Sequence, residues 1–445
     1  MYQEWSKLSP EEKREERFRR YISTEGREFV SPEARKAYQE RVNRFCNAVK
    51  MQTSDRVPII TPDISLDMAG VKFHTAMYDY DEFRRAYRNS IYNFDTDMFV
   101  CGYVPSGKVY DLLDTKEYLW PGHGLDLDCP GIQYLDKEYM TADEYDELIK
   151  SPNDFLWNKY IARLVGSFAP LTQFYDLTGV IGDIAPSATI MMKLSPAVLS
   201  TFQTLIDAAK ENWEWLKGSM EINMEAEKAG FPVWKMVAPG GVAPFDDIGN
   251  CMRGTRGILI DMYRQPDKLL EAMEFIANMR IERMKRFSAF FTDYPFSSMA
   301  LHKGGDAFMS DKQFATFYWP PLKKILLALI NEGFVPFIFA EGCFNTRLEH
   351  FMELPKGSVV WWFESTDMVR AKKILGNTAC IAGGITNPMI ALSQPQDIKE
   401  KCRELIEVCG KDGGFILASG GLGNIDKGKQ ENVRAMIEAV KEYCP

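Results

Sequence analysis

The chain has 445 residues, of which 46% are hydrophobic and 26% are charged, and its formal net charge is −9. This composition is typical of soluble enzymes. The negative charge argues against nucleic acid and anionic membrane as partners, because both repel an acidic surface. No window approaches the ~18 apolar residues that a membrane-spanning helix needs. The N-terminus is too acidic and polar for a signal peptide. We therefore expect a cytoplasmic protein.

Cysteine and histidine usage limits the kinds of metal or disulfide site. Nine cysteines are spread along the chain without a CxxC pair, and there are four histidines. An odd number of scattered cysteines favours reduced thiols over a disulfide framework. Four widely spaced histidines do not predict a His-rich metal site, but they leave a mixed-ligand site open.

Residues 1–54 are predicted to form a helical arm. The segment Ser9-Pro10-Glu11-Glu12 matches a capping box with proline at the first helical position, and Ser31-Pro32-Glu33 predicts a second helix start. We interpret the charged run at 11–20 as a solvated face or as an arm of a homodimer.

Residues 55–445 are predicted to form an α/β fold in which strands and helices alternate. Apolar runs that are typical of buried strands cover 56–61, 231–237, 295–302, 334–340, 358–363, 379–382 and 414–418. Alternation with helices indicates βαβ units and a parallel sheet. About eight such units favour a closed (β/α)8 TIM barrel over an open sheet. We interpret residues 75–150, which are rich in Asp, Tyr and Gly, as an insertion near the barrel mouth.

Ionisable residues stand directly at the ends of two of these strands, where barrels collect their chemistry. His302 and Lys303 end one strand, and Glu341 and Cys343 follow the next. We predict substrate binding by the first pair and catalysis by Glu341. A zinc site formed by Glu341, Cys343 and His302 is a further candidate. In the alternative, Cys343 is a small buried apolar residue and Glu341 pairs with Arg347.

The following strand also ends in carboxylates. Glu364 and Asp367 come directly after Trp362 and Phe363. A carboxylate beside aromatic rings tends to have a raised pKa, which suits a general acid, so both are catalytic candidates. Asp367 can instead cap the helix that begins at Met368. Trp362 is a candidate for the lining of a substrate pocket, with a place in the core as the alternative.

Two loops supply the remaining substrate-binding candidates. Asp247 ends the loop after the strand 231–237, and Asn424 lies in the Gly-rich stretch 419–424 that follows the last strand. Gly-rich loops after late barrel strands often hold anions, and a tight turn is the alternative interpretation.

From about residue 155 onward the sequence resembles the uroporphyrinogen decarboxylase superfamily. The segments that carry the resemblance include APFDD at 243–247, FYWPPLKK at 317–324, EGC at 341–343, FESTD at 363–367 and IAGG at 381–384. The resemblance implies a (β/α)8 barrel. It also implies one of two activities, which are cofactor-independent decarboxylation of tetrapyrrole side chains and methyl transfer that involves a corrinoid protein.

Two features of the resemblance favour methyl transfer. The Arg-rich N-terminal motif of the decarboxylase branch does not occur, and the first 150 residues look like the O-demethylase type of methyltransferase. The resemblance thus implies an anaerobic demethylation enzyme that moves a methyl group from a small methylated substrate, with a methyl ether as the leading candidate. The acceptor would be a corrinoid (cobalamin) on a partner protein, and Glu341 or Glu364 would protonate the leaving oxygen.

The resemblance leaves the metal and the reaction open at two points. In the thiol-methylating branch, zinc is held by a His-x-Cys pair and a late cysteine. Here Glu341-x-Cys343 matches the pair and Gly421 stands near the place of the late cysteine, so the site is altered or free of metal. The alternatives to methyl transfer are a decarboxylase that uses Arg253, Arg256 or Lys303 and a non-catalytic corrinoid or tetrapyrrole carrier.

Overall fold

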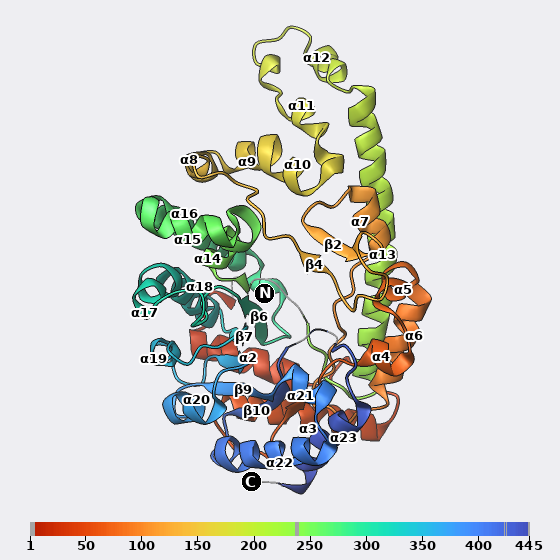
Figure 1. Cartoon of the computed structure of the whole chain (residues 1–445), viewed down its shortest axis with the longest axis vertical. Coiled ribbons are helices and arrows are strands. Elements are labelled where there is room, and N and C mark those ends of the chain that lie inside the picture. The colour runs from red at the N-terminus through yellow and green to blue at the C-terminus, as the bar shows by residue number, and fades with distance from the viewer. Residues whose placement is uncertain (1–4, 236–239, 422, 424, 444–445) are drawn as a thin grey trace.

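The computed structural model describes residues 5–235, 240–421, 423 and 425–443 (Figure 1). Its centre is a parallel sheet with the spatial order β1-β10-β9-β8-β7-β6-β5. The bounds of these strands are β1 Ile59–Ile60, β5 Gly241–Val242, β6 Phe296–Leu301, β7 Val335–Ala340, β8 Val360–Phe363, β9 Cys380–Ile385 and β10 Phe415–Ser419.

Backbone hydrogen bonds close this sheet into a ring. The Asp97 N–H donates to the carbonyl of Ile59 in β1 at 3.0 Å, and the Phe99 N–H donates to the carbonyl of Pro232 at 2.8 Å. Phe99 pairs in parallel with Val233, and the same stretch of chain continues to β5, which pairs with β6. The TIM-barrel-like α/β fold predicted from the alternation is therefore confirmed.

The barrel wall has an inner and an outer apolar layer, because successive side chains of a strand point to opposite faces. The inner layer contains Phe296, Phe337 and Trp362. The outer layer contains Ile338 and Trp361, which pack against the surrounding helices. The Trp361 ring, for example, stacks on Phe351 with 3.7 Å between ring centroids.

The outer helices follow the strands in sequence, and several begin at a Gln-Pro or capping-box signal. Their bounds are α14 Pro244–Asp246, α15 Gly254–Arg264, α16 Pro266–Phe287, α17 Asp311–Gln313, α18 Trp319–Asn331, α19 Leu348–Phe351, α20 Met368–Leu375, α21 Asn387–Leu392, α22 Pro395–Leu405 and α23 Gln430–Glu442.

The N-terminal helical extension is also confirmed. Helices α2 (Pro10–Ile22) and α3 (Pro32–Val49) begin at Ser9 and Ser31, and Ser9 forms the predicted capping box. The charged run in α2 is not simply a solvated face, because Arg17 is fully buried. Its guanidinium donates to the carbonyls of Ser288 and Glu332, which precede β6 and β7. The arm thus covers the end of the barrel at which the strands begin.

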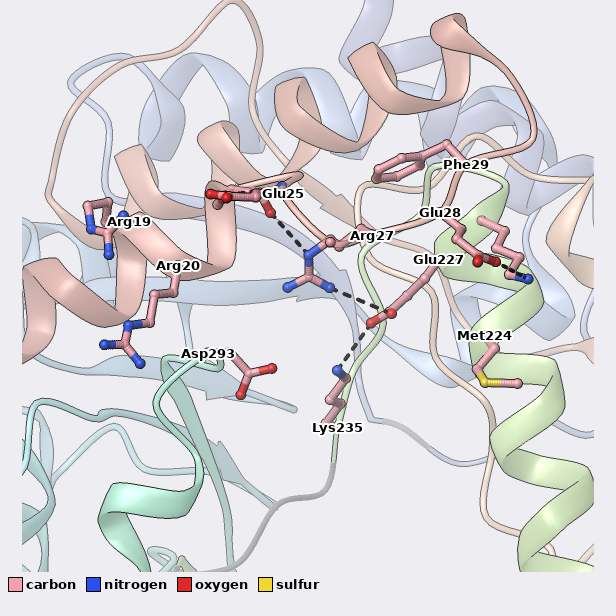
Figure 2. Close-up of a pocket in the computed structure, with 13 residues that line it drawn as sticks. Arg19, Arg20, Glu25, Arg27, Glu28, Phe29, Met224, Glu227, Lys235 and Asp293 are labelled. Carbon is pink, nitrogen blue, oxygen red and sulfur yellow. Dashed lines mark hydrogen bonds and ion pairs between the residues drawn. The ribbon is translucent and has the colours of Figure 1, made fainter. Parts of the chain in front are cut away.

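A charged cavity of about 600 Å³ lies between this arm and the barrel (Figure 2). Arg27, in the turn between α2 and α3, approaches Glu227 of α13 to 3.6 Å, and Lys235 approaches the same carboxylate to 3.2 Å from the barrel side. Through Glu227, these two ion pairs link the arm to α13 and to the barrel, at the end where the strands begin.

Residues between β1 and β5 form a second group of elements beside the barrel. The longest is α13, which extends along one side of the molecule and carries a projecting helical extension at its N-terminal end (Figure 1). The bounds are α4 Ser65–Ala69, α5 Phe73–Tyr78, α6 Tyr80–Ile91, α7 Gly107–Leu113, β2 Tyr118–Pro121, β3 Gly124–Leu125, β4 Gln133–Tyr134, α8 Tyr145–Lys150, α9 Pro152–Phe155, α10 Ile161–Leu164, α11 Leu171–Tyr175, α12 Pro186–Met192 and α13 Pro196–Lys228. Within the described residues, no helix combines the length and the apolarity needed to cross a membrane.

Candidate active site

The inward-facing rows of two neighbouring strands end in carboxylates. Phe337 and Phe339 of β7 face the interior, and Glu341 continues their alternation at the C-terminal end of the strand. Glu364 follows the inward-facing Trp362 of β8 in the same way. Alternation therefore directs both carboxylates toward the barrel axis.

The register of the parallel sheet brings these carboxylates to a histidine. Ala340 pairs with Leu301 on one side and with Phe363 on the other. The residues that follow these three stand side by side at one level of the barrel mouth: His302, Glu341 and Glu364. Neighbouring strands are ~4.8 Å apart, so such residues can act on one substrate.

A cavity of about 650 Å³ opens at this level. Its wall combines four aromatic rings with small residues of β5 and β6 and the glycines that follow β10. The aromatic lining residues are Trp234, Phe337, Phe339 and Trp362. Trp362 is fixed by its indole N–H, which donates to the Ser419 carbonyl at 2.6 Å. Apolar walls with a few polar groups at one end are typical of small-molecule sites.

His302 and Glu341 form a short polar contact at the rim of the cavity. The His302 Nδ1 and Glu341 Oε2 atoms are 2.6 Å apart. Burial alone would lower the pKa of His302, but the hydrogen bond to Glu341 and the charge of Asp246 outweigh it, so this pKa is raised. The same hydrogen bond lowers the pKa of Glu341. Both shifts favour an imidazolium held by a carboxylate, with Nε2 of the ring left for a ligand.

Asp246 binds the backbone N–H of His302. It was not among the site residues predicted from the sequence. This fully buried carboxylate accepts the N–H of His302 at 2.9 Å, the N–H of Lys303 at 2.8 Å and the hydroxyl of Tyr318 at 2.5 Å. Burial raises the pKa of Asp246. Its three donors fix the backbone at the tip of β6, which sets the direction of the imidazole.

Glu364 is positioned by the neighbouring tip. Its Oε2 accepts the N–H of Gly342 at 2.6 Å. Gly342 has φ +84°, a left-handed conformation that glycine adopts without strain. The turn after β7 thus orients its N–H toward the carboxylate of β8.

Among the residues that the structure describes, two buried polar atoms of the cavity wall find no hydrogen-bond partner. They are the indole Nε1 of Trp234 and the amide Oδ1 of Asn387. Trp234 is only 6% exposed. A buried donor or acceptor without a partner costs ~1–3 kcal/mol, so these two atoms are the natural points for a ligand to bind.

Cys343 and Asp367 do not line this cavity. The Cys343 thiol lies 3.4 Å from Asp306 Oδ2 and accepts the Asn345 amide at 3.1 Å. Asp367 caps α20 by accepting the N–H groups of Val369 at 2.9 Å and Arg370 at 3.1 Å. The structure therefore brings together His302 and Glu341 from the predicted zinc set but not Cys343.

A zinc ion does not fit the donor groups that the structure offers. In the described ranges, no three His, Cys, Asp or Glu side chains are grouped so that they could hold a metal ion. His302 and Glu341 bond to each other instead. The Cys343 thiol instead lies against Asp306 and Asn345.

Three other predicted substrate-binding residues lie outside the cavity wall or outside the described residues. The Lys303 Nζ points to Asn250 Oδ1, at 2.6 Å. Asp247 forms an ion pair with Arg280 behind β5, and burial raises the pKa of Asp247 to about 7. Asn424 is not among the described residues. Trp362, the remaining candidate, lines the cavity.

Comparisons with known proteins find a similar family in the second half of the chain and a similar fold over most of it. The sequence model of the Uroporphyrinogen decarboxylase (URO-D) family matches residues 235–443. This range contains His302, Glu341, Glu364 and Asn387. None of the curated proteins matches the chain in sequence.

One solved structure extends the likeness to the N-terminal part. A methyltransferase from Methanosarcina mazei superposes with a TM-score of 0.54 over 90% of this chain and 98% of that chain, at 15% sequence identity. At this identity the likeness concerns the fold. The comparisons together support the URO-D superfamily for the region that carries the cavity.

Proposed function

We propose that the chain is a methyltransferase that moves a methyl group from a small methyl ether to the corrinoid of a partner protein. The observation that carries this proposal is the His302–Glu341 pair at the rim of an aromatic cavity. An ether oxygen leaves poorly as an anion, so cleavage of its bond to the methyl group needs a proton donor at that oxygen. The similarity of fold to a methyltransferase agrees with this proposal.

The cavity wall suits a methylated aromatic compound. The Phe337 ring meets the rings of Trp234 and Trp362 edge-on, with centroids 4.6 Å and 6.0 Å apart. Rings that pack edge-to-face still expose some of their faces and edges, and the aromatic ring of a substrate can contact these. The free Trp234 N–H would donate to a polar substituent of the substrate, and Asn387 would bind a second polar group.

The proton would come from His302 rather than from Glu341. The pKa of Glu341 is lowered and that of His302 is raised, so the proton resides on the imidazole. In the transfer, the carbon–oxygen bond of the ether breaks and its electron pair stays on oxygen, which takes the Nε2 proton. The acceptor, Co(I) of the partner's corrinoid, supplies the electron pair of the new bond to the methyl carbon. Glu364 would orient the substrate at the same rim.

The decarboxylase alternative finds less support in this cavity. A bulky polycarboxylate needs cationic groups, but the described lining residues include no arginine or lysine. Arg253 is bound to Asp261 at 2.6 Å and lies with Arg256 at a different cavity. With two carboxylates at the rim, the mouth would repel such a substrate.

A methyl-transfer assay tests the proposal. Chemically reduced cob(I)alamin would be mixed with the protein and a panel of methoxylated aromatics, and methylcobalamin formation followed by absorbance. We expect turnover with at least one compound and a loss of about 100-fold or more in Glu341→Gln, because Glu341 keeps the proton on His302, the general acid, and general acid catalysis contributes about 10²–10⁴-fold.

The matched control is Glu349→Gln, which makes the same chemical change on α19, where the exposed Glu349 carboxylate forms an ion pair with Arg370 at 3.4 Å. This variant should keep the wild-type rate. No transfer with any methyl ether, or an equal rate in Glu341→Gln and the wild type, would refute the proposed function.

A further inference from the structure

The outward face of α13 carries an apolar repeat of seven residues. Seven-residue spacing places side chains in one nearly straight row along a helix and is the repeat by which helices pair in coiled coils. The first row consists of Leu199, Ile206, Trp213 and Met220, and the second, three residues further along, consists of Phe202, Ala209, Leu216 and Asn223. We call these two rows the α13 seam.

The α13 seam is exposed. Trp213 is 62% exposed, Met220 is 56% and Ile206 is 50%. The face of the helix turned away from the seam is already used, because Ala208, Ile222 and Ala226 are buried there. Figure 1 shows α13 at one side of the molecule, with α6 and α7 beside its lower half. The described residues of the seam belong to no apolar cluster of the core, although the Phe202 ring contacts Phe174 of α11 with 5.7 Å between ring centroids.

We propose that this seam binds the α13 seam of a second copy in antiparallel orientation, which makes the protein a two-fold symmetric dimer. An antiparallel pair aligns the first row of one helix with the second row of the other. The sequence positions allow this alignment over the whole seam with one register. The aligned pairs are 199 with 223, 202 with 220, 206 with 216 and 209 with 213.

Side-chain sizes match in this register. At the centre, Trp213 of each copy meets Ala209 of the other, so the largest side chain of the seam lies against the smallest. Ile206 meets Leu216, and Phe202 meets Met220. A parallel pair would instead place Trp213 against Trp213 and Ala209 against Ala209, which would combine a clash with a gap.

The flank of the seam has complementary charges. In the same register, Lys217 of one copy lies near Asp207 of the other, and Lys210 lies near Glu214. Within the described chain, neither Lys217 nor Glu214 has an ion-pair or hydrogen-bond partner, whereas Lys210 and Asp207 approach each other to 3.3 Å. In the two-fold dimer, Lys217 would therefore gain Asp207 of the other copy as a neighbour of opposite charge, and Glu214 would gain Lys210.

The area is sufficient for a stable contact. The six large apolar side chains of the seam are between 36% and 62% exposed. Side chains of this size expose on the order of 150–250 Å² when free. Two copies with their flanks would bury roughly 1,200 Å², at the lower limit for a specific interface. The patch on one copy, roughly 600 Å², is at the upper end of the range that monomers expose.

Sedimentation equilibrium of the full chain tests the dimer. We expect the wild type to sediment with twice the mass of one chain at micromolar concentration. Ile206→Glu combined with Met220→Glu should sediment with the mass of one chain, because it places charges in the seam. The matched control is Leu392→Glu, which adds a charge at a residue of α21 that is 76% exposed, and it should remain a dimer.

A size swap tests the antiparallel register. Ala209→Trp and Trp213→Ala alone should each weaken the dimer at least about tenfold, through a clash and a gap respectively. The double variant restores one large and one small side chain at each contact, so it should regain most of the wild-type affinity. Circular dichroism of each variant verifies that it is folded. A monomeric wild type, or dissociation of the Leu392→Glu control, would overturn the proposed interface. A double variant no tighter than the single variants would overturn the register.

Discussion

His302 is held from two sides, and this determines what its ring can do. Glu341 bonds Nδ1 at 2.6 Å, and Asp246 bonds the backbone N–H at 2.9 Å. With Nδ1 occupied, only Nε2 remains for a ligand. A carboxylate bonded to one nitrogen stabilises the imidazolium and fixes its orientation, as an acid at a barrel mouth requires.

Histidine titration by NMR would measure this effect directly. We expect His302 in the wild type to titrate above the ordinary value of about 6.5, because its pKa is raised. In Glu341→Gln, the midpoint should fall. The chain has only four histidines, and His302→Gln would identify the resonance. Equal midpoints in the two proteins would contradict the coupling.

The sign of the pH dependence follows from the same pair. The His302 pKa is raised on folding, so its contribution to stability is present below its unfolded-state pKa and is lost as the pH rises through the folded-state pKa. The Glu341 pKa is lowered, so its contribution is present above its unfolded-state pKa and is lost as the pH falls through the folded-state value.

Loss of the Asp246 carboxylate should lower the free energy of unfolding more than loss of the Tyr318 hydroxyl that it binds. Asp246→Ala leaves three donors unpaired, at a cost of about 3 kcal/mol or more, whereas Tyr318→Phe removes one donor and should cost about 1–2 kcal/mol. Urea unfolding would compare the two variants. A smaller loss in Asp246→Ala than in Tyr318→Phe would show that Asp246 does not organise the tip of β6.

Metal removal should have little effect. Because Cys343 bonds to Asp306 and Asn345 rather than meeting Glu341, we expect substoichiometric zinc in the purified protein and an unchanged methyl-transfer rate after chelation. Elemental analysis and the cobalamin assay would measure both quantities. Stoichiometric zinc whose removal abolishes transfer would contradict this expectation.

At the scale of elements, Asp367 illustrates how a cap can resemble a catalytic residue in a sequence. It stands after a buried strand, as a catalytic carboxylate does, but its side chain accepts the first N–H groups of α20. Asp367→Ala should therefore lower the free energy of unfolding by about 1 kcal/mol and leave methyl transfer unchanged. A loss of transfer at unchanged stability would return Asp367 to the catalytic candidates.

Most elements could be predicted because their boundaries have local causes. The capping box at Ser9 and the Ser31-Pro32 signal start helices where expected. The end of β9 could not be predicted, because Gly383 and Gly384 look like a turn although the strand continues to Ile385. Because the end of β9 was not predicted, Asn387, which begins α21 and lines the cavity, was not recognised as a site residue.

Tertiary pairing explains the other omissions. The strand position at 97–99 is only a few residues long and is recognised by its bonds to Ile59 and Pro232, which come from distant parts of the chain. Asp246 looks no different from Asp247 in sequence, but one bonds to the tip of β6 and the other to Arg280. Both features depend on contacts between distant parts of the chain, so no local sequence motif could predict them.

At the scale of the whole molecule, the two ends of the barrel differ: the N-terminal arm covers one end, and the candidate active site lies at the other. The N-terminal arm closes the end where strands begin, through buried Arg17 and the ion pairs in Figure 2. The opposite end holds the aromatic cavity and its ionisable rim. The strand alternation and register alone placed three of the predicted residues together at this rim, because a closed parallel barrel collects all strand tips at one end.

The most direct test of the account is the leaving-group dependence of single-turnover methyl transfer to cob(I)alamin in the wild type and in His302→Gln. A proton donor matters most for a poor leaving group. We predict that His302→Gln slows transfer from an unsubstituted methoxyarene by about 100-fold or more, and that the deficit shrinks steadily as nitro substituents make the leaving phenol more acidic. An equal deficit for all leaving groups, or no deficit, would contradict the role of His302 as the acid.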